Sequence, residues 1–269
     1  MPSGIGRAFE AARSERRGAF IGYLTSGFPT AEESGRLAHA LCDEGVDVLE
    51  LGVPFSDPMA DGPIIQRTTQ IALDGGATLD GVLRQAAALR AKHVTPLVLM
   101  SYLNPIHRYG VARFGRDAAA AGVDGVILVD LPPEEDPETW DAISGAGLET
   151  VALATPTTRT DRLPAIAARA RGFLYVVARL GVTGVGGADP IIFDLLDRCR
   201  ALTPLPRCLG FGMGLASDLA LYRGRVEGVI VGSGLLAPLL EEPDAAGREK
   251  SVRGFARAFR EKVKELGTE

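Results

Sequence analysis

Eight short, nearly continuously apolar runs alternate along this sequence with longer stretches rich in alanine, leucine and arginine. Continuous apolar runs are typical of parallel β-strands that are buried on both faces. Eight strand–helix units in succession favour a closed ring over an open sheet. The sequence therefore predicts an α/β fold, a single (β/α)8 TIM barrel, with strands at 19–25, 46–52, 95–101, 125–130, 148–154, 173–178, 207–211 and 226–232.

Several of the intervening stretches show the periodicity of amphipathic helices. One predicted helix, at 30–44, begins with Thr30, and Glu33 follows at the spacing of a capping box. A second, at 78–91, places its apolar residues on one stripe, and so does the stretch from 252 to 266 near the C-terminus. These helices have the length and pattern needed to cover the outside of a barrel.

The rest of the chain completes this organisation. An extra N-terminal helix near 4–16 is expected to precede the first strand and to cover the floor of the barrel. The polar stretch 241–249 is expected to be a loop. Because no linker or break in composition divides the chain, residues 1–269 are predicted to form a single domain.

Composition narrows the classes of function. The chain has a formal net charge of −5 and no stripe of lysine and arginine, which argues against nucleic acid as a partner. No apolar run approaches the ~18 residues of a membrane span. No secretory signal is visible at the N-terminus. The expected location is the cytoplasm, with no membrane involved.

Cysteines and histidines are few and lack the spacing of metal ligands. The cysteines lie in segments that are predicted as two helices and one strand, and they are expected to be small buried residues: Cys42, Cys199 and Cys208. The histidines are scattered, and all are expected to be structural or solvated: His39, His93 and His107. No metal site is predicted.

The second predicted strand contains a carboxylate within an apolar run. Side chains alternate across a strand, so Glu50 is expected to share a face with Val46 and Val48, while Leu49 and Leu51 face the helices. Glu50 would then point into the barrel near the carboxyl ends of the strands, where such barrels have their active sites. Desolvation would raise its pKa, as a proton donor at neutral pH requires. A structural Glu paired with Arg or Lys is the alternative.

A proline-rich loop with two aspartates follows Glu50. For an isolated aspartate, capping a turn or a helix is the commoner role, and this applies to Asp57 and Asp61 alike. The position of the loop, however, places it over the strand end that holds Glu50. One of these aspartates is therefore a candidate to act together with Glu50.

Glycine-rich segments follow the last three strands, at 181–184, 210–214 and 232–234. Glycine lets backbone N–H groups approach an anion, and a helix N-terminus adds a favourable dipole. Loops after strands seven and eight form a recurrent phosphate site in barrels. Neither GxxxxGK[ST] nor GxGxxG in the first unit is present, so nucleotide sites of those types are not predicted. None of the predicted strands contains lysine, which disfavours a Schiff base or a pyridoxal phosphate site within this chain.

These motifs together resemble the tryptophan synthase α chain family. The segment LELGVPFSDPMADGP (49–63) resembles the family signature, and it is long and specific. Supporting resemblances run over nearly the whole chain: GAFIGYLTSGFP, MSYLNPIHRYG, VDGVILVDLPPEE, YVVARLGVTG, GFGMG and VIVGSG. The strand-six continuation GVTGVGGAD lacks the charged residues that are often found there.

The resemblance implies a lyase of tryptophan biosynthesis. It would cleave indole-3-glycerol phosphate to indole and glyceraldehyde 3-phosphate by a retro-aldol reaction, without metal or cofactor in this chain. Glu50 would be the acid–base residue, and Asp61 would bind the indole N–H and stabilise positive charge on the ring. The remaining residues would bind substrate or close the site over it: Tyr23, Tyr175, Thr183, Gly184, Phe211, Gly212, Gly232 and Ser233. For Tyr23, Tyr175 and Phe211, ordinary core packing explains the residue equally well.

The resemblance also implies a partner, the tryptophan synthase β chain, which would hold pyridoxal phosphate and receive indole in an αββα tetramer. Loop 53–61 and the neighbourhood of Asn104 and Pro132 resemble the surface that faces this partner. Three alternatives remain: a stand-alone indole-releasing lyase, another phosphate-binding barrel such as an isomerase, and a non-catalytic regulatory barrel. The last two conflict with the presence of both Glu50 and Asp61.

Overall fold

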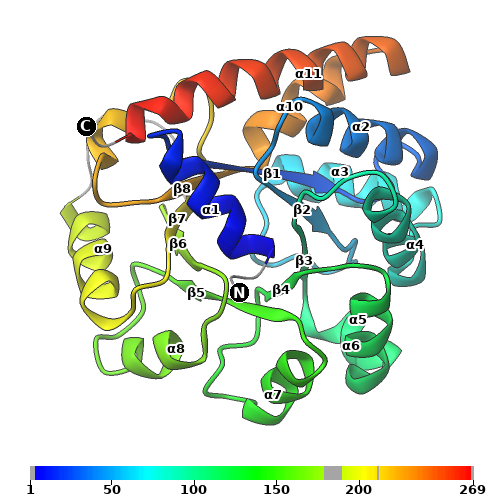
Figure 1. The fold of residues 1–269 in the computed structure, drawn as a ribbon. Helices are drawn as coiled ribbons and strands as arrows, with labels where there is room; N and C mark the ends of the chain where they lie inside the picture. The colour runs from blue at the N-terminus through cyan, green and yellow to red at the C-terminus, as the bar shows by residue number, and fades with distance from the viewer. Residues whose placement is uncertain (1–3, 179–189, 211, 268–269) are drawn as a thin grey trace.

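A computed structural model describes residues 4–178, 190–210 and 212–267 of the chain. Its eight strands are all parallel and form a closed barrel in the order of the sequence, with β8 pairing back to β1 (Figure 1). The predicted (β/α)8 fold is confirmed, and every strand lies within its predicted run. The strands are β1 (Ala19–Thr25), β2 (Val48–Gly52), β3 (Leu97–Ser101), β4 (Gly125–Leu128), β5 (Glu149–Ala154), β6 (Leu174–Val177), β7 (Arg207–Gly210) and β8 (Gly228–Val231).

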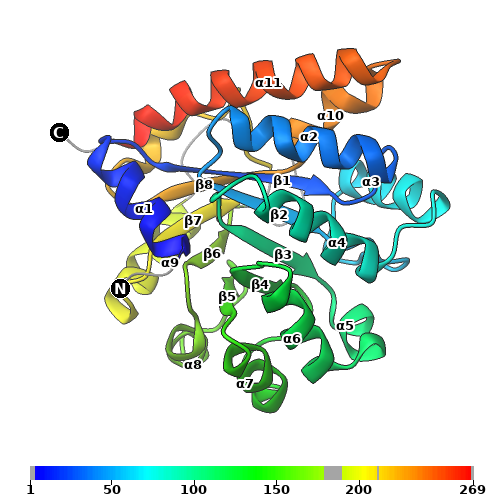
Figure 2. The same cartoon turned by 45° about the vertical axis from the view of Figure 1, so that its right-hand side comes forward.

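Helices surround the barrel (Figure 2). Thr30 caps the first helix of the ring by accepting a hydrogen bond from Glu33 N at 3.2 Å, whereas the Glu33 carboxylate pairs with Arg248 near the C-terminus at 2.9 Å. Only half of the predicted capping box is therefore present. The helices are α1 (Gly4–Ser14), α2 (Ala31–Asp43), α3 (Pro63–Asp74), α4 (Leu79–Arg90), α5 (Leu103–Tyr109), α6 (Val111–Ala120), α7 (Pro137–Gly145), α8 (Leu163–Arg169), α9 (Pro190–Leu202), α10 (Ser233–Glu241) and α11 (Ala245–Lys262), with 3-10 turns η1 (Leu219–Tyr222) and η2 (Val263–Leu266). None of the helices in the described ranges is both long and apolar enough to cross a membrane.

The first helix covers the amino-terminal end of the barrel, as predicted. Phe9 of α1 packs against Phe173, the residue before β6, with ring centroids 5.9 Å apart. A Cβ on Gly125, at the start of β4, would lie 3.1 Å from Ile5 Cδ1. Figure 1 shows α1 crossing this end of the strands. Because α1 fills the floor, the functional site must lie at the carboxyl ends of the strands.

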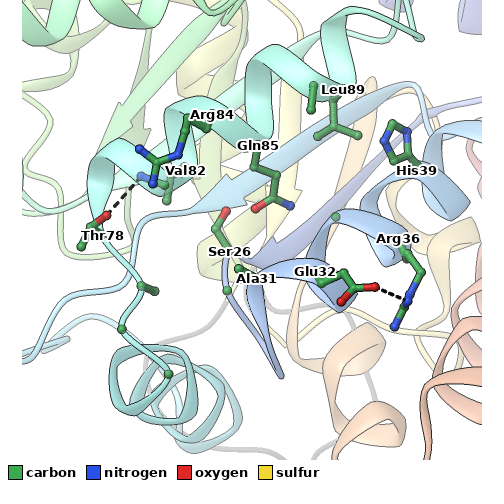
Figure 3. A pocket seen from close by; sticks show the side chains of 17 residues that line it. Ser26, Ala31, Glu32, Arg36, His39, Thr78, Val82, Arg84, Gln85 and Leu89 are labelled. Carbon is green, nitrogen blue, oxygen red and sulfur yellow. Dashed lines mark hydrogen bonds and ion pairs between the residues drawn. The ribbon is translucent and has the colours of Figure 1, made fainter.

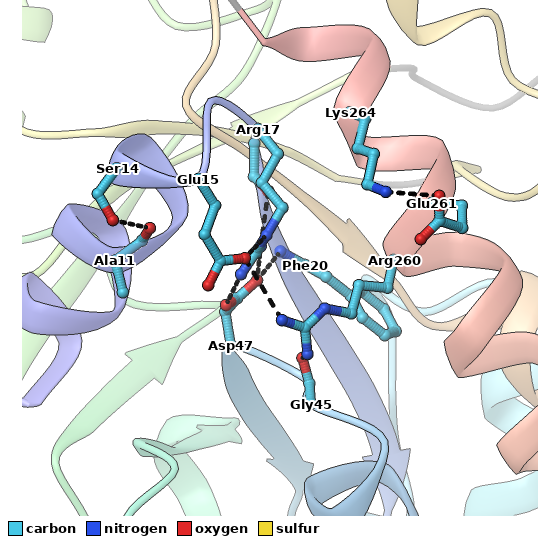
Figure 4. Close-up of polar contacts among 11 residues, drawn as sticks. Ala11, Ser14, Glu15, Arg17, Phe20, Gly45, Asp47, Arg260, Glu261 and Lys264 are labelled. Carbon is cyan, nitrogen blue, oxygen red and sulfur yellow. Dashed lines mark hydrogen bonds and ion pairs between the residues drawn. The ribbon is translucent and has the colours of Figure 1, made fainter.

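A buried ion pair ties α1 to the barrel (Figure 4). Both terminal nitrogens of Arg17 bind the Asp47 carboxylate, at 2.5 and 2.8 Å, and the Arg17 side chain is almost fully buried. Asp47 also accepts a hydrogen bond from Phe20 N at 2.8 Å, so it links the residues before β2 to β1. The pair therefore fixes the start of both strands.

The last helix closes the ring on the first strand. Phe20 of β1 packs on Phe259 of α11, with ring centroids 5.0 Å apart. Arg257 of α11 binds Glu44, directly after α2, through two hydrogen bonds of 2.7 Å. The two ends of the sequence thus form one continuous part of the outer layer.

Two expectations about local structure were wrong. Val46 precedes β2 and lies on the helix side of the sheet, because a Cβ on Gly22 would lie 3.2 Å from Val46 and 3.6 Å from Leu41 of α2. The alternation that places Glu50 inward therefore holds only from Val48 onward. The stretch 241–249 is not a long loop, since only residues 242–244 separate α10 from α11.

The cysteines are free and buried, and they lie on α2, α9 and β7, as expected. His39 and His93 form a pair that was not predicted, with Nδ1 of His39 2.8 Å from Nε2 of His93. Within the described ranges, no group of three or more His, Cys, Asp or Glu side chains could hold a metal ion.

Candidate active site

Glu50 is the buried acid at the centre of the candidate site. Strand pairing aligns it with Tyr23 on β1 and Val98 on β3, and all three side chains lie on the inner face of the barrel. Glu50 is 1% exposed, and neither carboxylate oxygen has a hydrogen-bond partner among the described residues. Burial raises the pKa of Glu50 to about 8, and the nearby Asp61 adds to this. The side chain is therefore protonated at neutral pH.

Asp61 lies in the loop between β2 and α3. Gly62, not Asp61, is the N-cap residue of α3, so the capping role does not apply to this aspartate. Its Oδ1 atom is buried without a hydrogen-bond partner among the described residues, and its Oδ2 atom accepts a hydrogen bond from Tyr102 Oη at 3.2 Å. Burial raises the pKa of Asp61 to about 6, while the Tyr102 hydrogen bond opposes the rise. Asp57, in the same loop, is exposed and accepts a hydrogen bond from Ser56.

Tyr102 is a site residue that the sequence analysis missed. It directly follows β3, and its hydroxyl accepts a hydrogen bond from Ala60 N at 2.9 Å while donating to Asp61. Its ring also packs against Phe55, with centroids 5.2 Å apart. The signal was available, because Tyr102 is a polar side chain at a strand end, the place where barrels carry their functional residues.

Tyr23 and Tyr175 both lie inside the barrel, at 4% and 5% exposure. Each fits because a neighbouring strand ends in glycine. A Cβ on Gly52 would lie 2.5 Å from Tyr23 Cζ, and one on Gly210 would lie 2.5 Å from Tyr175 Cζ. Gly210 of the GFGMG motif therefore makes room for an aromatic ring. The two tyrosines lie beside Glu50 in the barrel interior, and burial raises the pKa of both hydroxyls well above the usual range, with smaller contributions from the Asp61 and Glu50 carboxyl groups.

Three of the predicted phosphate-binding residues lie at the ends of β7 and β8. Gly212 has a φ of +75°, which glycine adopts readily, and no other part of the described chain lies within 4 Å of where its Cβ would be. Gly232 is the N-cap of α10 and makes no side-chain cap, and Ser233 is the first residue of that helix. The hydrogen bonds of this helix begin at Leu235 and Leu236, whose backbone N–H groups both donate to Gly232 O.

The backbone N–H groups of Ser233 and Gly234 consequently face the open end of α10, beside the loop after β7. A Cβ on Gly234 would lie 3.0 Å from Met213 O and 3.2 Å from Gly214 Cα, so the two loops touch backbone to backbone. This close packing leaves no room for a side chain at position 234, which explains why the GSG motif ends in glycine. The arrangement has the features of an anion site, because a helix dipole and backbone N–H groups that have no partner among the described residues meet at glycines.

Thr183, Gly184 and Phe211 lie outside the described residues. Their predicted roles stay predictions.

A separate groove of about 530 Å³ lies on the outside of the barrel between α2 and α4 (Figure 3). Its lining includes Ser26, Arg36 and Gln85, and none of the predicted site residues. Arg36 is paired with Glu32 at 2.8 Å along α2. The groove is therefore distinct from the carboxylate pair inside the barrel.

The candidate site thus contains two buried carboxyl groups with different pKa values, and Tyr23 lies between them and the N-terminus of α10, since it pairs with Glu50 and a Cβ on Gly232 would lie 3.2 Å from its ring. At neutral pH, Glu50 carries a proton and Asp61 is ionised. Such a pair can supply an acid and a fixed negative charge to one substrate.

Comparisons with known proteins agree on one family. The sequence profile of the family described as "Tryptophan synthase alpha chain" matches residues 9–266. The tryptophan synthase alpha chain of Desulfosudis oleivorans is 44% identical over 247 residues, which cover 90% of this chain and 93% of the relative. That of Xylella fastidiosa is 46% identical over 242 residues, covering 89% of this chain and 90% of the relative.

Solved structures show the same likeness. The tryptophan synthase alpha subunit of Legionella pneumophila has a TM-score of 0.87 at 35% identity, covering 98% of this chain and 99% of the other. A chain of Mycobacterium tuberculosis tryptophan synthase has a TM-score of 0.86 at 34% identity, with 98% and 99% covered. The chain therefore belongs to the tryptophan synthase alpha chain family, the lyases of tryptophan biosynthesis that cleave indole-3-glycerol phosphate.

Proposed function

We propose that Glu50 and Asp61 carry out the cleavage of indole-3-glycerol phosphate to indole and glyceraldehyde 3-phosphate in this chain, as the α subunit of a tryptophan synthase. The observation that carries the proposal is the pair of buried carboxyl groups with pKa values of about 8 and about 6. Between these values one group holds its proton and the other its charge, which divides the roles of acid and electrostatic stabiliser between them.

The reaction requires that one proton is added to the indole ring and that one proton is removed from a hydroxyl of the side chain. Glu50 donates its proton to the indole carbon that carries the glycerol phosphate chain, which places positive charge on the ring nitrogen. Asp61 accepts a hydrogen bond from the ring N–H and stabilises that charge. The bond between the ring and the side chain then breaks, and its electron pair restores the aromatic ring. The hydroxyl on the departing carbon loses its proton to Glu50 and becomes the aldehyde, so protons and electrons balance without a metal or cofactor.

Two groups of residues bind the two parts of the substrate, the indole ring and the phosphate. Tyr23, Tyr175 and Phe211 line the region of the indole ring. Gly184, Gly212, Gly232 and Ser233 hold the phosphate, and Thr183 closes the strand-six loop over Asp61. The buried positions of Tyr23 and Tyr175, and the open α10 N-terminus at Gly232, support this assignment.

The same proposal extends to the assembly. The partner is a β chain that holds pyridoxal phosphate and takes up the indole within an αββα tetramer. Loop 53–61 is a candidate contact surface, since its Met59 is 85% exposed next to the site. We also propose that residues 1–269 act as a single domain, that this chain has no cofactor of its own, and that it works in the cytoplasm.

The test is indole formation from indole-3-glycerol phosphate, measured with and without a tryptophan synthase β chain. Glu50→Gln keeps the shape of the side chain and removes the exchangeable proton, so indole release falls to background while the circular dichroism spectrum and phosphate affinity are retained. Asp61→Asn lowers the rate at least ~10²-fold, the usual scale for one positioned charged group.

Asp80→Asn is the matched control, because Asp80 is an exposed carboxylate on α4. Full activity of Glu50→Gln, or an Asp61→Asn effect confined to thermal stability, would remove these residues from the mechanism.

A further inference from the structure

Tyr102 joins β3 to two parts of the loop that carries Asp61. Its hydroxyl oxygen lies 2.9 Å from Ala60 N and 3.2 Å from Asp61 Oδ2, and its ring packs on Phe55 at the start of the loop. Tyr102 is 3% exposed, so these contacts form away from water. One side chain therefore holds both the beginning and the end of the loop against a rigid strand.

The direction of the two hydrogen bonds is fixed by chemistry. A backbone N–H only donates, so the Tyr102 oxygen accepts from Ala60 and its proton is directed to the Asp61 carboxylate. Burial and the neighbouring Asp61 raise the pKa of Tyr102 well above its usual range. The hydroxyl consequently stays a donor at every pH at which the protein works.

This donor stabilises the charged form of Asp61. Burial alone favours the protonated acid, and the Tyr102 hydrogen bond is the contribution that lowers the pKa of Asp61. The other carboxylate oxygen, Oδ1, has no hydrogen-bond partner among the described residues and is left for a substrate.

We propose that Tyr102 is a positioning residue of the active site, which holds the ionised carboxylate of Asp61 in place for the substrate by binding one of its oxygens and the adjacent backbone. The proposal rests on the function proposed above, because it gives Tyr102 its effect through Asp61. It predicts that the hydroxyl matters for the charge state of Asp61 as well as for the order of the loop.

The test is Tyr102→Phe, which keeps the ring and its packing on Phe55 but removes both hydrogen bonds. A hydrogen bond to a charged group has the magnitude of about one pKa unit, so the acid limb of the kcat/KM profile moves up by about one pH unit. At pH 5 the variant loses roughly tenfold in kcat/KM, at pH 7 the loss is about twofold, and the deficit nearly disappears as the pH approaches 8.

Two variants separate this effect from a merely structural one. Tyr109→Phe is the matched control, because Tyr109 donates to Asp117 at 2.8 Å in the same way, away from the site. It leaves the pH profile unchanged. Phe55→Leu weakens the ring packing while the hydroxyl stays, so it lowers the thermal midpoint more than it moves the acid limb.

A second readout does not depend on activity. Titration of the side-chain carboxyl by 13C NMR, with Asp61→Asn to assign the signal, gives a higher Asp61 midpoint in Tyr102→Phe than in the parent. An unchanged midpoint together with a lower melting temperature would overturn the proposal. Should Glu50→Gln and Asp61→Asn both retain full activity, the proposed function fails, while the NMR midpoint still decides whether Tyr102 controls Asp61.

Discussion

The ring of Tyr23 occupies the space that a side chain at Gly52 would need, with Cζ 2.5 Å from where the Cβ would be. These residues lie on adjacent strands and both face the barrel interior, with Tyr23 paired directly with Glu50 and Gly52 two residues further along β2. Tyr175 and Gly210 repeat the relationship on β6 and β7. Two strand-end glycines thus set the shape of the space around the carboxylate pair.

Gly52→Ala is expected to displace Tyr23 and to lower indole release. Overpacking of a dense core costs about 1–3 kcal/mol, so the free energy of unfolding falls by that amount. Urea denaturation and the indole assay measure the two effects. The control is Gly35→Ala in α2, where nothing lies within 4 Å of the added Cβ. Replacing a helix-interior glycine with alanine stabilises by about 0.5–1 kcal/mol. Equal effects of the two substitutions would contradict this account.

Indole release is expected to follow a bell-shaped pH profile. Asp61 must be ionised, so activity is lost as the pH falls through about 6. Glu50 must be protonated, so activity is lost as the pH rises through about 8. The optimum then lies near neutrality, and kcat/KM measured from pH 5 to 9.5 reports both limbs. A flat profile over this range would show that neither carboxyl group titrates in the working enzyme.

Glu50→Gln is expected to make the fold more stable in alkaline solution. The pKa of Glu50 is raised from its ordinary value of 4.5 to about 8 in the folded chain, so the folded state binds the proton more tightly than the unfolded state. The contribution of the Glu50 proton to the parent's free energy of unfolding is therefore fully present below pH 4.5 and is lost as the pH rises toward 8. The variant lacks this loss, and its advantage reaches on the order of 4–5 kcal/mol at pH 8.5. Urea denaturation of both proteins at pH 5 and pH 8.5 measures this difference in the free energy of unfolding. A difference that does not grow with pH would contradict the raised pKa of Glu50 in the folded chain.

Arg17→Met is expected to destabilise the fold by about 3–5 kcal/mol, the cost of leaving a buried charge without its partner. The substitution leaves the Asp47 side chain, which is 9% exposed, without the guanidinium that holds both its oxygens. Arg36→Met provides the comparison, since Arg36 pairs with Glu32 on an exposed helix face. Such i,i+4 pairs contribute about 0.2–0.5 kcal/mol. Chemical denaturation of the two variants should separate them clearly, and similar losses would argue against burial as the cause.

The strands were predictable from the sequence because burial on both faces leaves a continuous apolar run. The errors lie where that rule stops. Val46 is apolar and adjoins β2, yet it belongs to the approach to the strand, where Asp47 is held by Arg17 and Phe20 N. A sequence pattern does not distinguish an apolar residue in a strand from one just before it.

The carboxylate pair was predictable, whereas its surroundings were not. Glu50 is an ionisable residue within an otherwise apolar run, so it can be recognised from the sequence alone. Tyr102 bonds to Asp61 from 41 positions away, and its role depends on how a loop folds back. The same holds for Gly52 and Gly210, because only the closed barrel shows that each faces a tyrosine.

The contact of Phe20 with Phe259, and the pairing of β1 with β8, have a consequence for synthesis on the ribosome. The first strand emerges early but finds its second neighbour and its covering helix only when nearly the whole message has been translated. Until then the nascent chain has an unpaired strand edge and an uncovered phenylalanine, both of which promote aggregation. Premature termination before α11 thus leaves Phe20 of β1 uncovered, and the truncated chain is prone to aggregate. We expect cellular quality control to degrade such a chain.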